Sequence, residues 1–159
     1  MSLIDRLLNF AESKIVAYHG SLKPVAAFSS SHTSINSWAM GSYDVKRTGI
    51  FFASKPEDAK QYGPHVQRYE LDLRKIANLD NGDLIAQFRD SIDAFDDREM
   101  WLSAKYAAET WMFFDGERGE RFVSWLKSRG FDSATFLEDA GKTYVLFDPK
   151  AIKTIAGKE

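Results

Sequence analysis

The sequence predicts an α+β fold in which a single domain spans residues 1–159. Short apolar segments typical of β-strands lie toward both ends of the chain, and amphipathic helical patterns fill the middle. Strands followed by helices and then again by strands are typical of the α+β class. The chain has 159 residues, of which 44% are apolar, so it can bury a hydrophobic core. No Pro/Gly/Ser-rich linker divides it in two.

Two short apolar strands are expected in the first third of the chain. Residues 15–18 form the first strand and residues 49–53 form the second. The Ser-rich segment between them, residues 22–48, shows no clean period, so we expect a long packed loop with one helical turn. Ser54 should cap the short helix that follows, and this helix should end at Tyr62.

The rest of the chain alternates between strands and helices. A strand with alternating apolar residues is expected over residues 66–73. Residues 83–129 carry three apolar helical faces and should form a helical middle. The chain then returns to strands over residues 131–137, 143–147 and 152–156.

Composition excludes several classes of protein. The chain has 21 basic and 23 acidic residues and a net charge of -2, so no overall basic field favours nucleic acid. It has no cysteine, which excludes disulfides, thiolate zinc sites and a cysteine nucleophile, and its three histidines lack metal-ligand spacing. We expect no metal. No apolar run approaches the roughly 18 residues of a membrane span, and no signal peptide is recognised. We therefore expect a cytoplasmic protein without a membrane partner.

One group of residues suggests a binding slot. The first strand ends in His19-Gly20, and a backbone without a Cβ at Gly20 can approach a planar carboxamide closely. Phe51 and Tyr62 belong to different elements and can stack on either side of a flat ring. Taken singly, His19 and Phe51 would be structural residues, and the functional interpretation depends on their combination.

These segments resemble the ADP-ribosyltransferase superfamily. The sequence YHGS at residues 18–21, then GIFFAS at 49–54 and DAKQY at 58–62, is similar to the diphtheria-toxin/poly(ADP-ribose)-polymerase branch with its His-Tyr-Glu triad. The separation of Phe51 from Tyr62 is the one that branch keeps between its stacking aromatics. The segment RGFDSATFLEDAGKTYVLFDPKAIKTI resembles the closing hairpin of small phage and bacterial members. The resemblance implies split antiparallel β-sheets, here with a helical insertion.

The resemblance also implies NAD as the substrate and assigns residues to it. His19 would bind a ribose hydroxyl, and Gly20 would hold the nicotinamide amide through its backbone, with Ser21 beside them. Phe51 and Tyr62 would take the two stacking positions around the nicotinamide. Phe51 stands where the family has Tyr, so the stack is kept but a hydrogen bond from that position is lost.

The catalytic carboxylate is where the sequence departs from the family pattern. Thr143 occupies the position of the family Glu, and the nearest carboxylates are Glu138 and Asp139, in a natural hairpin turn. Cleavage of the bond between nicotinamide and ribose builds an oxocarbenium-like cation, which a carboxylate near the ribose 2′-hydroxyl would stabilise. Such a group can also orient the acceptor. We take Glu138 as the first candidate and Asp139 as the second. The next carboxylates to examine are Glu99, Glu109 and Asp115.

Binding of the NAD pyrophosphate requires local cations. Lys46 and Arg47 directly precede the second strand, and Lys55 follows it. The Ser-rich residues 29–37 can add hydroxyl and backbone N–H groups. Without a ligand, the same cations would be ordinary solvated loop charges.

The function expected from the resemblance is mono-ADP-ribosylation of a macromolecule with NAD, by a phage or bacterial effector or toxin. The acceptor is expected to be a protein rather than a nucleic acid. One alternative is an NAD glycohydrolase toxin with water as the nucleophile, or an NAD-dependent RNA 2′-phosphotransferase-like protein. A second alternative, motivated by Thr143, is a degenerate module that keeps the fold and binds NAD or protein without turnover. The sequence leaves the oligomeric state open.

Overall fold

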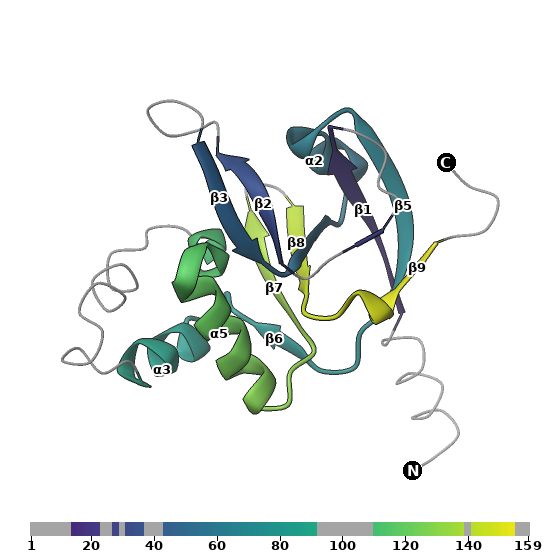
Figure 1. Ribbon diagram of the computed structural model, residues 1–159. Helices are drawn as coiled ribbons and strands as arrows, with labels where there is room; N and C mark the ends of the chain where they lie inside the picture. The colour runs from purple at the N-terminus through teal and green to yellow at the C-terminus, as the bar shows by residue number, and fades with distance from the viewer. Residues whose placement is uncertain are drawn as a thin grey trace, which may run out of the picture.

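The computed structural model describes residues 14–22, 27–28, 31–36, 43–91, 110–138 and 141–154, and it confirms the predicted α+β class (Figure 1). The strands are β1 (Lys14–Ser21), β2 (Ser31–Asn36), β3 (Tyr43–Thr48), β4 (Ile50–Ala53), β5 (His65–Asp72), β6 (Ile76–Asn78), β7 (Ser133–Glu138), β8 (Gly141–Leu146) and β9 (Ile152–Thr154). The described helices are α2 (Pro56–Ala59), α3 (Asp83–Ser91) and α5 (Gly116–Ser128), with 3-10 turns η1 (Lys60–Tyr62), η2 (Thr110–Phe114) and η3 (Pro149–Ala151).

Seven of these strands form one sheet in the order β6-β7-β8-β4-β1-β5-β9, and β2 pairs with β3 in a separate ribbon. The β6–β7 pair is parallel, and the other pairs of the large sheet are antiparallel. Strands β1 and β4 meet at the single register pair Tyr18↔Ala53. The large sheet is therefore built from two halves, β6-β7-β8-β4 and β1-β5-β9, which join at one point. This arrangement agrees with the split antiparallel sheets expected from the resemblance.

Strand β4 places aromatic side chains on both faces of the sheet. All four of its residues are buried, which matches the continuous apolar run in the sequence. Neighbouring residues of a strand point to opposite faces. Phe51 accordingly packs in a core cluster with Phe114, Phe122 and Phe136, whereas Phe52 packs in a second cluster.

The predicted helical insertion lies between β6 and β7 in the sequence and against one face of their half of the sheet (Figure 1). Helix α5 buries Gly119, Phe122, Val123 and Leu126, the spacing of an amphipathic helix. The structure describes residues 83–91 and 110–128 of this middle, and the segment between them lies outside the described residues. None of the described helices is long and apolar enough to span a membrane.

Two sequence predictions about local structure were wrong, and one strand was not predicted. The segment 22–48, predicted as a loop, contains the strands β2 and β3, which pair with each other. The short strand β6 was missed. Ser54 does not cap α2: the N-cap residue is Lys55, and the Ser54 hydroxyl instead accepts a hydrogen bond of 3.0 Å from the Lys142 backbone N–H. Ser54 therefore ties the start of α2 to β8.

Candidate active site

The position of Tyr62 depends on close packing between β1 and the α2–η1 segment. A Cβ atom at Gly20 would overlap the carbonyl oxygen of Ala59, and one at Gly63 would overlap the backbone of Ser21. Gly63 also has a φ of 148°, a conformation that other residues rarely adopt. The two glycines therefore let the α2–η1 segment lie directly on the end of β1. This close packing fixes the position of the Tyr62 backbone. Gly20 therefore has a packing role, in addition to the predicted role of its backbone in holding the nicotinamide amide.

Glu138 is held in place by two hydroxyl groups. It ends β7, where Phe136 pairs with Thr143 and Glu138 pairs with Gly141 across the hairpin. Diagonal neighbours in such a pair are within reach of a long side chain. The Thr143 hydroxyl donates to Glu138 Oε1 at 2.7 Å, and the Tyr62 hydroxyl also donates to the Glu138 side chain. The residue at the family Glu position thus contacts a carboxylate supplied by the neighbouring strand.

The environment of Tyr62 keeps its hydroxyl protonated. Burial is the largest cause that raises the pKa of Tyr62 above its ordinary value. The negative charges of Glu138 and Asp58 raise this pKa further, while the positive charge of Arg47 lowers it. At neutral pH, Tyr62 is therefore a hydrogen-bond donor, which suits a carboxylate partner.

Arg47 covers the ring of Phe51. The Arg47 guanidinium carbon lies 4.8 Å from the centre of that ring and 5.5 Å from the Trp111 ring. Arg47 Nε donates to Asp115 Oδ1 at 2.7 Å, and Nη2 donates to Oδ2 at 3.3 Å. Both side chains of the pair are mostly buried, at 11% and 12% exposed. The ion pair holds η2 and α5 of the insertion against β3 and the Phe51 ring.

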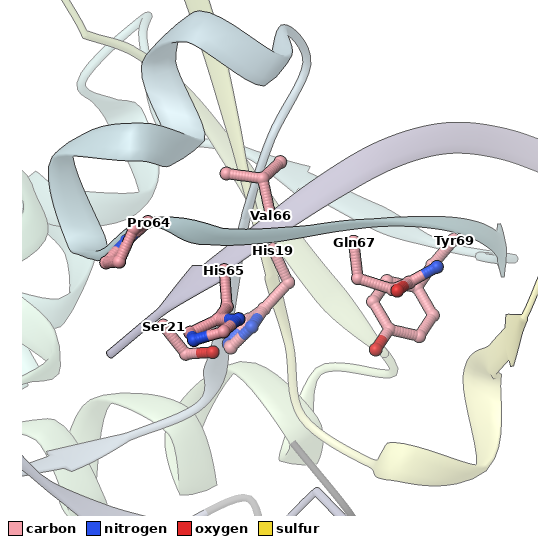
Figure 2. Close-up of a pocket in the computed structure, with 7 residues that line it drawn as sticks. All are labelled: His19, Ser21, Pro64, His65, Val66, Gln67 and Tyr69. Atoms are coloured by element: carbon pink, nitrogen blue, oxygen red, sulfur yellow. The ribbon is translucent and has the colours of Figure 1, made fainter. Parts of the chain in front are cut away.

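His19 lies at a separate pocket. Its ring contacts Phe28 and Phe52, with centroid separations of 5.0 and 5.4 Å. Strand alternation places His19 on the face of β1 opposite the contact between Gly20 and Ala59. The pocket has a volume of about 320 Å³ and is lined by His19, Ser21, Pro64, His65, Val66, Gln67 and Tyr69. Figure 2 shows the side chains of His19, Ser21 and His65 pointing to the same side of β5.

The predicted site residues therefore fall into two groups. In the first group, Tyr62 contacts Glu138, and the positive charge of Arg47 lowers the pKa of Tyr62. The Arg47 guanidinium also stacks on Phe51. These residues lie on the Gly20 side of the sheet. His19 and Ser21 line the pocket on the other side. Other candidates could not be placed: the side chain of Lys46 and the residues Asp139, Glu99 and Glu109 lie outside the described residues.

Sequence reasoning did not single out two residues that belong to this group. Thr143 was noted only as a departure from the family pattern, and the hairpin register would have indicated its contact with Glu138. Asp58 lies in the first turn of α2, where acidic residues are ordinary. The sequence contains no signal that brings Asp58 to the hairpin.

A match to a protein family agrees with the resemblance. Among the curated proteins compared, none matches this chain. A solved structure described as the crystal structure of an anti-CRISPR protein is similar, with a TM-score of 0.48 and 14% identity, covering 92% of this chain and 98% of that chain. The family model described as ADP-ribosyltransferase in polyvalent proteins matches residues 13–159, which include the helical middle. The chain therefore belongs to this family of ADP-ribosyltransferases.

Proposed function

We propose that the protein is an NAD-dependent mono-ADP-ribosyltransferase of the diphtheria-toxin/poly(ADP-ribose)-polymerase type, acting on a protein target in the cytoplasm. The observation that carries the proposal is the contact of Glu138 with both Thr143 and Tyr62. It supplies the carboxylate that the reaction requires, from the strand beside Thr143, which holds the position of the family Glu. This contact argues against a degenerate binding module.

The carboxylate of Glu138 serves the step in which the bond to nicotinamide breaks. Positive charge then develops on the ribose, and a preoriented carboxylate stabilises it. Tyr62 and Thr143 fix the carboxylate in advance, so little reorganisation is needed during the reaction. The acceptor forms a bond to the ribose carbon that carried nicotinamide. Nicotinamide leaves, and the acceptor gives up its proton.

His19 and Ser21 are proposed to bind a ribose hydroxyl of NAD. They line a pocket that also offers the polar groups of His65, Gln67 and Tyr69. No Lys, Arg, Asp or Glu is among the described residues that line it, which suits a neutral ribose better than a pyrophosphate. Its volume of about 320 Å³ is at the lower end of the range for ligand pockets, so it suits a part of NAD.

The pyrophosphate needs a different contact. Arg47 is already paired with Asp115 and stacked on Phe51. We therefore propose that the pyrophosphate binds Lys46 or Lys55, the other two cations expected from the sequence, and keep Arg47 as support for the stacking position. The phage or bacterial effector role belongs to this proposal as well, since transfer to a host protein is what such an effector would perform.

The proposal is tested by incubating the protein with a bacterial lysate and NAD labelled in its adenylate half. The expected result is label on protein and release of free nicotinamide. Label that appears only as free ADP-ribose would identify a glycohydrolase, and label on nucleic acid would change the acceptor class. If NAD is not consumed beyond the level of heat-denatured protein, the proposed activity is wrong.

A further inference from the structure

Arg68, in the middle of β5, is a cation for which the described residues supply no partner. Its Nε atom is shielded from solvent and has no hydrogen-bond partner among them, and no ion pair joins its guanidinium to a described carboxylate. Loss of water around a charged group without such a partner costs free energy and calls for an explanation. The residue as a whole is half-buried, so part of it still reaches solvent. An anion from outside the chain would offset the cost.

Register pairs place Arg68 in line with the candidate catalytic group. Arg68 pairs with Tyr18, and Tyr18 pairs with Ala53. Ala53 in turn pairs with Thr143, whose hydroxyl binds the candidate catalytic carboxylate. Residues directly opposite each other in neighbouring strands have their side chains on the same face of the sheet. Arg68 therefore lies on the face that carries this carboxylate, three strand spacings or roughly 14 Å from Thr143.

The surface beside Arg68 can be reached by a large partner. Val16 pairs with Glu70, the next residue after Arg68 on this face of β5, and Val16 is 41% exposed. Helix α2 packs over Gly20, which lies on the other side of Tyr18 along β1. The described residues therefore leave the surface between Val16 and Arg68 uncovered.

The other charges on this face of β5 have an opposite charge beside them. Glu70 lies opposite Lys153 in the register of β5 and β9. Asp72 forms an ion pair of 3.0 Å with Arg74. Arg68 is thus the charge of β5 on this face that the described residues leave unbalanced, and its sign favours an anionic partner.

We propose that Arg68 is a specificity-determining residue that binds an acidic side chain of the protein acceptor. The inference rests on the proposed function, which takes the acceptor to be a protein. A guanidinium presents a fork of N–H donors that matches a carboxylate. An extended peptide covers roughly 14 Å in about four residues, so the acidic residue lies at least about four positions from the modified one. The phosphates of NAD match this position less well, because they are joined to the ribose beside Glu138 through its C5′ atom.

The test compares the parent with Arg68→Met in the labelling of lysate proteins by NAD labelled in its adenylate half. Met keeps an unbranched apolar stem and removes the charge. At low lysate concentration the variant should label protein about tenfold more slowly. Its NAD affinity, measured by calorimetry, should be unchanged, and its thermal midpoint should be equal or higher because an unpartnered charge is gone. Arg121→Met, at an exposed position of α5, is the matched control and should label protein at the parent rate.

A second measurement uses the parent protein alone and does not depend on how a variant folds. Free polyglutamate supplies carboxylates without an established acceptor sequence. It should inhibit protein labelling in competition with the lysate, and sodium chloride of the same ionic strength should inhibit much less. Polyglutamate that inhibits no more than the salt overturns the inference.

The outcomes separate this inference from the proposed function. A folded Arg68→Met variant that labels protein at the parent rate overturns the inference alone, while protein labelling by the parent still supports the proposed function. Weaker NAD affinity of this variant would assign Arg68 to NAD and also overturns the inference. A parent that consumes no NAD, or that labels only nucleic acid, overturns both. If Arg68→Met does not fold, the polyglutamate measurement decides.

Discussion

Tyr62 contributes a ring and a hydroxyl, and two substitutions separate them. Tyr62→Phe keeps the ring but removes the donor to Glu138. A hydrogen bond to a charged group contributes about 1.5–3 kcal/mol, so turnover should fall about tenfold or more while NAD affinity stays unchanged. Tyr62→Ala should also weaken NAD binding by about 1–2 kcal/mol. Steady-state kinetics and calorimetry measure the two effects. Normal turnover of Tyr62→Phe would remove the hydroxyl from the mechanism.

The pKa of Tyr62 predicts a loss of stability in alkaline solution. The pKa is higher in the folded protein than in the unfolded chain, mainly because of burial. Above about pH 10 the unfolded chain loses this proton while the folded protein keeps it, so stability falls as pH rises. Urea unfolding at pH 9 and pH 11 should show a smaller loss for Tyr62→Phe than for the parent. Equal losses would mean that Tyr62 is not the group responsible, and would point to Tyr69 and Tyr144, whose pKa values are also raised by burial.

At the scale of elements, the contact between β1 and α2 can be tested at Gly20. A Cβ atom there would meet the Ala59 backbone, which cannot rotate away as a side chain can. Gly20→Ala should lower the free energy of unfolding by about 1–3 kcal/mol and displace Tyr62. The control Gln61→Ala, at an exposed position of η1, should stay within about 0.5 kcal/mol of the parent. Denaturant unfolding measures the free energy of unfolding of both variants. A Gly20→Ala variant as stable as the control would contradict the packing argument.

The Arg47–Asp115 pair joins β3 to the helical insertion. Because both side chains are largely buried, removing either partner leaves an uncompensated charge. Arg47→Met and Asp115→Leu should each destabilise the protein by about 3 kcal/mol, and the double variant by less than their sum. Urea unfolding of the parent and the three variants gives the coupling free energy between Arg47 and Asp115. Strictly additive effects would show that the pair contributes no interaction of its own.

At the scale of the whole molecule, the elements that could be predicted from the sequence are those whose apolar residues show a clear pattern. Strand β4 is a continuous apolar run, and α5 has apolar residues at helical spacing. The strands β2 and β3 were missed because their segments are rich in polar residues and pair with each other. That residues 1–159 form one domain stays a prediction.

The site could be predicted in part for a similar reason. Tyr62 and Glu138 were chosen from patterns close in sequence, namely the segment after β4 and the turn after β7. The contacts of Arg47 with Asp115 link residues separated by 68 positions, and no local pattern encodes that pairing. The position of Asp58 against Gly141 likewise depends on how α2 packs on the hairpin. The assignment of Asp139 and Lys46 stays a prediction.

The most direct test of the account is the turnover of NAD by Glu138→Gln beside the parent. Gln keeps the shape of the side chain and removes the charge that would stabilise the ribose cation. The account predicts a loss of about two to three orders of magnitude in turnover, about 3–4 kcal/mol, with NAD affinity and thermal unfolding nearly unchanged. Asp139→Asn, measured in parallel, should have a milder effect. Near-normal turnover by Glu138→Gln would contradict the central claim that Glu138 is the catalytic carboxylate.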